Sequence, residues 1–126
     1  METRTRIYIV DDSAAIRARL NEMLAKMAGV AVVGEASSAS EAIPGILRTH
    51  PHSVLLDLNL MGRTGLEVML AVLKEAPETV FVVLTNHAEP QYRRACAKAG
   101  AAYFLDKSAD FDRVPAVIAE IAATNH

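Results

Sequence analysis

The most informative run for predicting the fold is Ser53-Val54-Leu55-Leu56-Asp57. Its central residues are apolar without interruption, which is typical of a β-strand covered on both faces, and an aspartate comes at its end. A second run of this kind is Arg6-Ile7-Tyr8-Ile9-Val10, which is followed by Asp11 and Asp12. Two buried strands that each end in acidic residues predict a sheet with polar groups gathered at one edge.

Outward from these two runs, short β-branched segments alternate with longer segments of helical period. We expect strands at 6–10, 30–36, 53–57, 79–84 and 101–105, and helices at 13–27, about 40–48, 64–75, 90–100 and from about 114 onward. Short connections in this alternation predict a parallel sheet with helices on both faces. The expected fold is therefore an α/β, flavodoxin-like three-layer αβα sandwich, with five parallel strands in the order 2-1-3-4-5.

The start of the second helix is open to two interpretations. Ser38 and Glu41 form a possible capping box, but a start there would place Pro44 deep inside the helix. A start at about Ser40 keeps Pro44 in a tolerable first turn, so the sequence leaves the start of this helix open between the two.

Length and composition limit the class of protein. The 126 residues suit one domain, so we expect a single domain over 1–126. The net charge of −2 provides no basic field, which argues against direct nucleic acid binding by this domain. The single cysteine, Cys96, is expected to be a small buried residue. No apolar run approaches the ~20 residues of a membrane span, and no signal-like segment is present, so we expect a cytoplasmic protein without membrane contact.

The polar residues at the predicted strand ends indicate where the chemistry lies. In open α/β sheets, ligands bind beyond the carboxyl ends of the strands, where the strand order reverses. That rim would collect the side chains of Asp11, Asp12, Asp57, Thr85 and Lys107. Three carboxylates in one place repel one another, and a hard divalent cation such as Mg²⁺ or Mn²⁺ relieves this better than zinc would.

The same residues suit phosphoryl transfer to a carboxylate nucleophile. Lys107 can neutralise a phosphoryl oxygen, and Thr85 can donate a hydrogen bond to another. Taken singly, each residue has an ordinary structural explanation: Asp12 as a helix cap, Thr85 as a β-branched strand end, Lys107 as a solvated lysine. Their joint occurrence at four strand ends is what favours function.

At this point the chain resembles the receiver domain family of bacterial two-component signalling over essentially its whole length. The matching residues are Val10-Asp11-Asp12-Ser13, Leu56-Asp57-Leu58-Asn59-Leu60, Gly65, Leu84-Thr85, Gly100-Ala101 and Lys107. The resemblance implies that Asp57 is the phosphoacceptor. It also implies Mg²⁺ bound by Asp12, Asp57 and the backbone carbonyl of Asn59, with Asp11 acting mainly through water.

The resemblance further implies how such a domain would switch. Lys107 would pair with the phosphoryl group, Thr85 would move toward it, and Phe104 would respond by repacking, while Tyr103 should point to the opposite side of its strand. The output face would carry Arg93, Arg94, Lys98 and Arg113. The domain would then be a phosphoacceptor switch rather than an enzyme acting on other substrates.

The resemblance also implies the kinds of partner. A sensor histidine kinase or histidine phosphotransfer protein would dock near Ala14, Ala15 and Ile16. The output would be a downstream protein target or a C-terminal output domain, and a phosphorylation-dependent dimer is possible.

Several positions depart from the family pattern. Ser108 replaces the usual proline after the lysine, and we expect the Lys107–Ser108 bond to be cis nonetheless, at a cost of ~3–4 kcal/mol. Met61 replaces another usual proline, which predicts a more mobile loop. Asn86 stands where a small residue is usual and would crowd the phosphate. Asn59 and His87 occupy positions that tune autodephosphorylation in the family, and we expect His87 to overhang the pocket and gate the attacking water.

Three alternatives remain in view. A phosphohydrolase of the haloacid dehalogenase type needs a second acid two residues after its nucleophile, where this chain has Asn59. A flavin-binding domain would need a glycine- and hydroxyl-rich loop in place of Asp11-Asp12. A pseudo-receiver, which interacts with partners and takes no phosphate, would not need the complete set of site residues.

Overall fold

The computed structural model describes residues 4–60 and 63–124, so the mobility predicted around Met61 lies outside the described residues. Its main sheet has five parallel strands in the order β2-β1-β3-β6-β7. They are β1 (Thr5–Val10), β2 (Val30–Ala36), β3 (Ser53–Leu56), β6 (Val80–Thr85) and β7 (Tyr103–Asp106). Numbered by chain order among themselves, these strands follow the predicted order 2-1-3-4-5.

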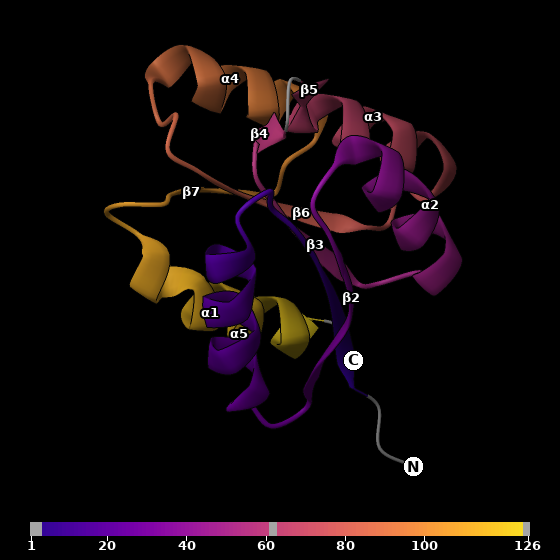
Figure 1. Ribbon diagram of the computed structural model, residues 1–126, viewed down its shortest axis with the longest axis vertical. Coiled ribbons are helices and arrows are strands. Elements are labelled where there is room, and N and C mark those ends of the chain that lie inside the picture. Colours follow the sequence, from indigo (N-terminus) through magenta and orange to yellow (C-terminus); the bar gives the residue numbers. More distant parts are fainter. Residues whose placement is uncertain (1–3, 61–62, 125–126) are drawn as a thin grey trace.

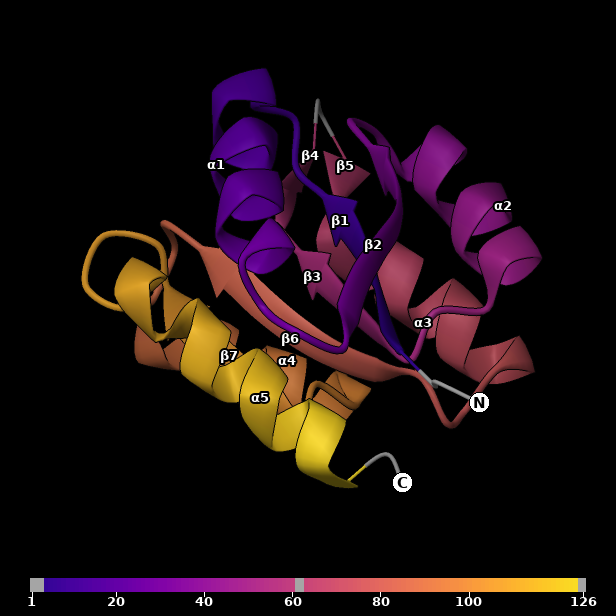
Figure 2. The same cartoon turned by 90° about the horizontal axis from the view of Figure 1, so that it is seen from below.

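Helices cover both faces of this sheet, as the sequence predicted (Figure 1). One face carries α2 (Ala39–Thr49), α3 (Gly65–Glu75) and α4 (Pro90–Ala99). The other carries α1 (Ala14–Ala25) and α5 (Val114–Thr124), the latter preceded by the 3₁₀ turn η1 (Phe111–Arg113). Figure 2, seen from below, shows α1 and α5 together on their face. The architecture is therefore the flavodoxin-like αβα sandwich. No helix in the described ranges is long and apolar enough to cross a membrane.

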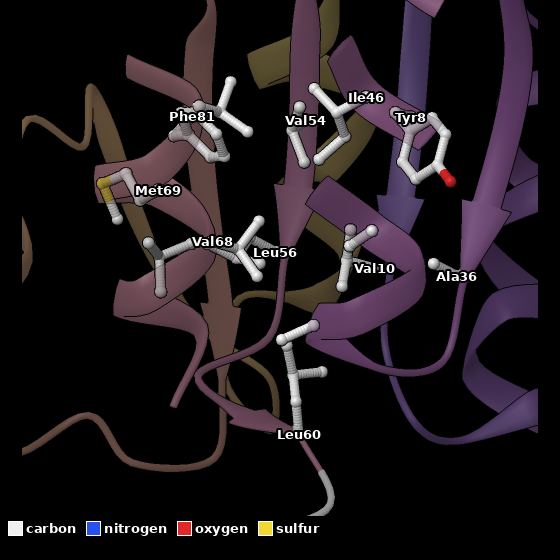
Figure 3. Close-up of a cluster of buried hydrophobic side chains, with 14 of the residues drawn as sticks. Tyr8, Val10, Ala36, Ile46, Val54, Leu56, Leu60, Val68, Met69 and Phe81 are labelled. Carbon is white, nitrogen blue, oxygen red and sulfur yellow. The ribbon is translucent and has the colours of Figure 1, made fainter. Parts of the chain in front are cut away.

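The uninterrupted apolar strands are explained by two cores, one on each face of the sheet. Tyr8, Val10, Val54, Leu56 and Phe81 point toward α2 and α3 (Figure 3). The other strand residues point to the α1–α5 face, and these include Ile7, Ile9, Leu55, Val82, Leu84 and Leu105. Side chains alternate along a strand, so a strand buried on both sides must be apolar at every position. Cys96 is buried in the first core, as expected.

The structure decides between the two starts that the sequence left open for α2. Ser38 is the N-cap, because its hydroxyl accepts from the Glu41 N–H at 3.3 Å and Glu41 accepts in turn from the Ser37 N–H at 3.1 Å. Pro44 therefore lies inside the helix and removes one backbone N–H. Both Pro44 and Ser40, whose carbonyl loses that donor, are exposed, so water can take its place.

The structure also contains a two-stranded antiparallel hairpin that the sequence did not predict. It pairs β4 (Asn59–Leu60) with β5 (Arg63–Thr64), directly after Asp57. Two residues a side are too few to show a period of two, so no pattern revealed it. The hairpin buries Leu60 against the core and leads into α3, whose N-cap Thr64 accepts from the Leu66 N–H at 3.0 Å.

The predicted cis bond at Lys107–Ser108 was wrong, because no described peptide bond is cis. Serine differs from proline in carrying an N–H, and the Ser108 N–H donates to Oδ1 of Asp106 at 2.8 Å. The Ala109 N–H donates to the same oxygen at 3.3 Å. The Asp106 side chain therefore stabilises this turn with a trans bond, and the ~3–4 kcal/mol of a non-proline cis bond is avoided.

Candidate functional site

The pairing of β1 with β3 brings two aspartates side by side. Val10 lies beside Leu56 in the parallel register, and the Asp57 N–H donates to the Val10 carbonyl at 3.0 Å. Asp11 and Asp57 therefore leave neighbouring strands at the same level, at the carboxyl edge of the sheet. Both are buried although both are acidic.

Lys107 reaches the same point from the far end of β7. Its backbone N–H donates to the Thr85 carbonyl at 2.8 Å. Its Nζ lies 2.7 Å from Oδ2 of Asp11 and 3.1 Å from Oδ2 of Asp57, and only 9% of its side chain is exposed. A lysine and two carboxylates thus form one buried ionic cluster.

Burial and charge act against each other in this cluster. Desolvation raises the pKa of Asp57, and the nearby charge and hydrogen bond of Lys107 oppose this only in part. For Lys107, desolvation by itself would lower the pKa, but the hydrogen bond to Asp11 and the charges of Asp57 and Asp11 leave it raised. The ammonium form of Lys107 is therefore strongly favoured in this position.

The acidic residues fit a divalent cation. Carboxylate oxygens of Asp11, Asp12 and Asp57 all lie within 4.8 Å of one another. When all three are ionised, the single ammonium of Lys107 leaves two negative charges uncompensated, which a divalent ion would cancel. An all-oxygen donor set is the kind that Mg²⁺ prefers. The residues present thus suit the Mg²⁺ that the resemblance implied.

A cavity of about 350 Å³ opens over this cluster. Its lining residues are Asp12, Ser13, Ile16, Asp57, Asn59, Asn86, His87 and Lys107. Three predicted site residues, Asp12, Asp57 and Lys107, therefore line one cavity, and so do the predicted tuning residues Asn59 and His87. Asn86 lines it too, and the lining is polar apart from Ile16.

Phe104 and, by the alternation of side chains along β6, Thr85 lie on the α2–α4 side of the sheet. Phe104 is beside Val83 in the register and packs against the α2–α4 core, and Thr85 is two residues beyond Val83. The Thr85 side chain is buried and does not line the cavity; its Oγ1 accepts from the His87 N–H at 3.2 Å. As predicted, Tyr103 packs on the opposite face.

One basic residue of the predicted output face, Arg93, joins α4 to β7. The guanidinium of Arg93 lies 4.7 Å from the centre of the Phe104 ring, a cation–π contact. Arg94, Lys98 and Arg113 are exposed. Movement of Phe104 would therefore reach the basic face of α4 directly.

Gly65 permits the close approach of α3 to Asp57. Its N–H donates to the Leu58 carbonyl at 2.8 Å, and a Cβ at this position would collide with the carbonyl oxygen of Asp57. A side chain at position 65 would thus displace the backbone that carries the central carboxylate. The sequence had marked this glycine only by resemblance.

Sequence reasoning missed one residue that contacts the acidic loop. The guanidinium of Arg17 donates to the Asp11 carbonyl at 2.6 Å from the first turns of α1. No local pattern distinguishes this arginine from the others on the helix. Of the residues predicted to dock a kinase, Ala14 and Ala15 are exposed and Ile16 lines the cavity.

The fold and this site define a class: a doubly wound domain with an acidic, lysine-neutralised cluster at its topological switch point. Comparison with known proteins gives the family. The model of the response regulator receiver domain matches residues 7–119, so the chain belongs to that family, which works in bacterial two-component systems. Such domains are phosphorylation-dependent signalling switches rather than enzymes.

Individual relatives agree. The chain is 32% identical over 109 residues to the response regulator GacA of Pseudomonas protegens, covering 86% of this chain and 51% of GacA. It is 30% identical over 115 residues to UvrY of Escherichia coli, covering 91% of this chain and 53% of UvrY. The chain thus spans about half the length of these curated relatives.

Solved structures show the same likeness. A LuxR-family two-component response regulator from Aurantimonas superposes with a TM-score of 0.89 at 29% identity, over 97% of this chain and 87% of that one. The signal receiver domain of the putative response regulator NarL from Mycobacterium tuberculosis gives 0.87 at 27% identity, over 96% and 98%.

Proposed function

We propose that this domain is a switch in which Asp57 accepts a phosphoryl group from a phosphohistidine. The observation that carries the proposal is the position of Asp57: a buried carboxylate, 3.1 Å from the ammonium of Lys107, that faces a polar cavity. A single domain over 1–126 would perform this step, with a sensor histidine kinase or a histidine phosphotransfer protein as donor.

The proposed phosphoryl transfer forms one bond to phosphorus and breaks one. One carboxylate oxygen of Asp57 attacks phosphorus as the bond from phosphorus to the imidazole nitrogen breaks. The electron pair of that bond stays with the imidazole, which can then take a proton from water. Lys107 supplies a fixed positive charge close to where negative charge develops on the phosphoryl oxygens, and it needs no reorganisation to do so.

A divalent cation would complete this arrangement. Asp12, Asp57 and the backbone carbonyl of Asn59 are the groups that would hold Mg²⁺, with Asp11 acting through water. When bound, the ion would neutralise charge on the phosphoryl oxygens and orient them toward Asp57. Asp11 already uses one carboxylate oxygen on Lys107 and the other on the Ser13 N–H at 2.8 Å, which suits an indirect role.

The output would begin at Thr85. To reach a phosphoryl group on Asp57, its hydroxyl must leave the His87 N–H and turn toward the cavity. The space vacated on the α4 side lies next to Phe104, whose ring can follow by packing alone because it lacks a hydroxyl. This would change the exposed face that carries Arg93 and Arg94, where a downstream target, an output domain or a second copy would bind.

Binding of beryllofluoride with Mg²⁺ tests the proposal, since this anion mimics a phosphoryl group on a carboxylate. We expect wild-type protein to bind it and to show amide shifts in NMR spectra at Thr85 and Phe104. Asp57→Asn should bind none. Asp112→Asn, which removes an exposed acid on η1 far along the chain, is the matched control and should behave as wild type.

If wild type gave no Mg²⁺-dependent spectral change, the domain would be a pseudo-receiver that serves only as an interaction module, and the proposal would be rejected.

A further inference from the structure

We infer that Arg17 is a positioning residue for the acidic site, and that it acts by fixing the peptide group between Asp11 and Asp12. The inference rests on the proposed function, because it assigns this arginine a part in presenting the acidic loop to a divalent cation. Its basis is a chain of contacts that runs from β2 through α1 to that loop.

Arg17 holds the loop with one end of its guanidinium and a strand with the other. Its Nη1 donates to the Asp11 carbonyl at 2.6 Å, while its Nε donates to Oε1 of Glu35 at 2.8 Å. Only 18% of the Arg17 side chain is exposed. Water therefore competes little for the contact with the Asp11 carbonyl, although the Glu35 carboxylate is 44% exposed, and a planar group bound at two places cannot rotate freely.

Glu35 is itself held in place. Its second oxygen, Oε2, accepts from Nδ2 of Asn21 at 2.9 Å, and the same Nδ2 donates to the Arg17 carbonyl at 2.9 Å. Asn21 and Arg17 are one turn apart on α1, and Glu35 comes from the adjacent strand β2. The three side chains thus form a frame, and this frame holds the acidic loop at the Asp11 carbonyl.

The peptide plane explains why this contact matters to both acids. The Asp11 carbonyl and the Asp12 N–H belong to one planar peptide group. Fixing the carbonyl therefore also fixes the orientation of the Asp12 N–H and the position of the Asp12 Cα atom. The rest of Asp11 is already held: its N–H donates to the Ala36 carbonyl at 3.1 Å, and its carboxylate bonds Ser13 and Lys107. Asp12 is exposed, so its placement depends on the backbone that Arg17 orients.

An ordinary explanation for Arg17 is a helix-to-strand ion pair. Glu35 is 44% exposed, and ion pairs of that kind contribute little to stability. That explanation accounts for the contact with Glu35 but gives no reason for the short, charged hydrogen bond to the Asp11 carbonyl. The two explanations also differ in what they predict for metal binding.

Mg²⁺ binding by Arg17→Ala is the principal test. Loss of outer groups that orient metal ligands lowers affinity about 10–100-fold, and we expect the dissociation constant for Mg²⁺ to rise within that range. Phosphoryl uptake at saturating Mg²⁺ should be nearly retained, because Asp57 and Lys107 are untouched. Arg17→Lys should fall between, since an ammonium can reach one of the two acceptors but cannot bridge both.

Arg19→Ala is the matched control. Arg19 is an exposed arginine on the same helix, and its guanidinium lies 4.2 Å from the centre of the Phe111 ring, on the side of α5. The Arg19→Ala variant should therefore have the same Mg²⁺ affinity as wild type. Glu35→Ala should weaken Mg²⁺ binding in the same direction as Arg17→Ala, and the double variant should be no worse than Arg17→Ala, because Glu35 acts through Arg17.

Amide shifts in the metal-free protein separate this inference from the proposed function. We expect Arg17→Ala to shift the Asp12 and Ser13 amides while the β3 and β6 amides stay in place, which shows that the variant is folded. Unchanged amides at Asp12 and Ser13, or wild-type Mg²⁺ affinity in the folded variant, would overturn the inference. If wild type itself bound no Mg²⁺, the proposed function would fail, and the amide shifts would still decide whether Arg17 orients the loop.

Discussion

At the scale of single residues, the site depends on groups that are buried in spite of their charge. Asp11 and Asp57 remain in the interior because Lys107 lies against both, and because backbone N–H groups of Ser13 and Asn59 donate to their carboxylates at 2.8 and 3.2 Å. Removing one partner of such a cluster leaves an uncompensated buried charge, which is far more costly than losing an exposed ion pair. Substitutions at residues around the cluster can therefore be used to study the chemistry, provided that they leave the contacts between Asp11, Asp57 and Lys107 intact.

His87 is such a residue. It lines the cavity, its ring lies 5.6 Å from that of Tyr92, and its backbone restrains the Thr85 hydroxyl. If its side chain limits water at the acceptor, His87→Ala should shorten the half-life of the phosphorylated protein severalfold, as followed by loss of label. His50→Asn is the control, because asparagine tolerates the left-handed backbone at that exposed position (φ 49°). An unchanged half-life in His87→Ala would remove the gating role.

His52 should make stability depend on pH. Its Nδ1 accepts from the Arg6 N–H at 2.9 Å, so only the neutral ring fits. Desolvation and the charge of Arg6 lower the pKa of His52 in the folded state. Between the folded and unfolded pKa values the unfolded chain binds more protons, so this contribution is complete above about pH 6.5 and is lost as pH falls through the lower folded value.

The measurement is the melting temperature of wild type and His52→Asn from about pH 7.5 to pH 5. Wild type should lose stability more steeply on acidification, because asparagine can also accept from Arg6 but does not titrate. Parallel curves would show that His52 does not contribute.

At the scale of elements, α2 packs against β1 through a glycine that faces Tyr8. A Cβ at Gly45 would collide with the Tyr8 hydroxyl and lie 3.0 Å from the ring carbon that bears it. Gly45→Ala should therefore destabilise the protein by about 1–3 kcal/mol, the usual range for overpacking. The Tyr8 hydroxyl makes only a long contact of 3.5 Å with the Glu35 carbonyl, so Tyr8→Phe alone should have little effect.

Urea denaturation of the two single variants and the double variant checks this packing. Tyr8→Phe should restore part of the stability that Gly45→Ala loses. Additive losses would mean that the clash lies elsewhere.

Element boundaries show what the sequence could predict and what it could not. The predicted strand 30–36 and the predicted helix starts at Ser13 and Thr64 were right, because local patterns and the capping side chains of these two residues determine them. The start of α2 stayed open in the sequence because the rule against internal proline competed with the capping box at Ser38 and Glu41, and the structure shows that the capping box is present. The predicted cis bond between Lys107 and Ser108 was wrong because the Ser108 N–H donates a hydrogen bond to Asp106 that a proline could not make.

At the scale of the whole molecule, the convergence of the acidic residues was predictable because it follows from topology. Parallel strands end at one edge, so Asp11, Asp57 and Lys107 had to approach one another once the strand order was known. Arg17 and Glu35 could not be found in this way. Their contact joins positions on a helix and on a neighbouring strand, and nothing in either local pattern indicates the other.

Metal binding should be visible in the stability of the whole domain. Folding brings three carboxylates close to a single lysine, so the folded state carries excess negative charge at this site. A bound divalent cation cancels that charge and stabilises the folded state. At free Mg²⁺ about 100 times the dissociation constant, the folded state should gain about 2.7 kcal/mol, and the melting temperature should rise accordingly. Chelation should reverse the rise. Asp12→Asn, which removes one proposed ligand, should show much less of it, whereas a melting temperature indifferent to Mg²⁺ in wild type would argue against the site.

The proposal that Asp57 accepts a phosphoryl group is tested most simply by the intact mass of the protein after incubation with a small-molecule phosphodonor and Mg²⁺. Wild type should gain the mass of one phosphoryl group, the group should map to Asp57 after chemical trapping, and the gain should vanish with chelator or with Asp57→Asn. A wild-type mass that does not change, or a phosphoryl group mapped to any other residue, would contradict the account.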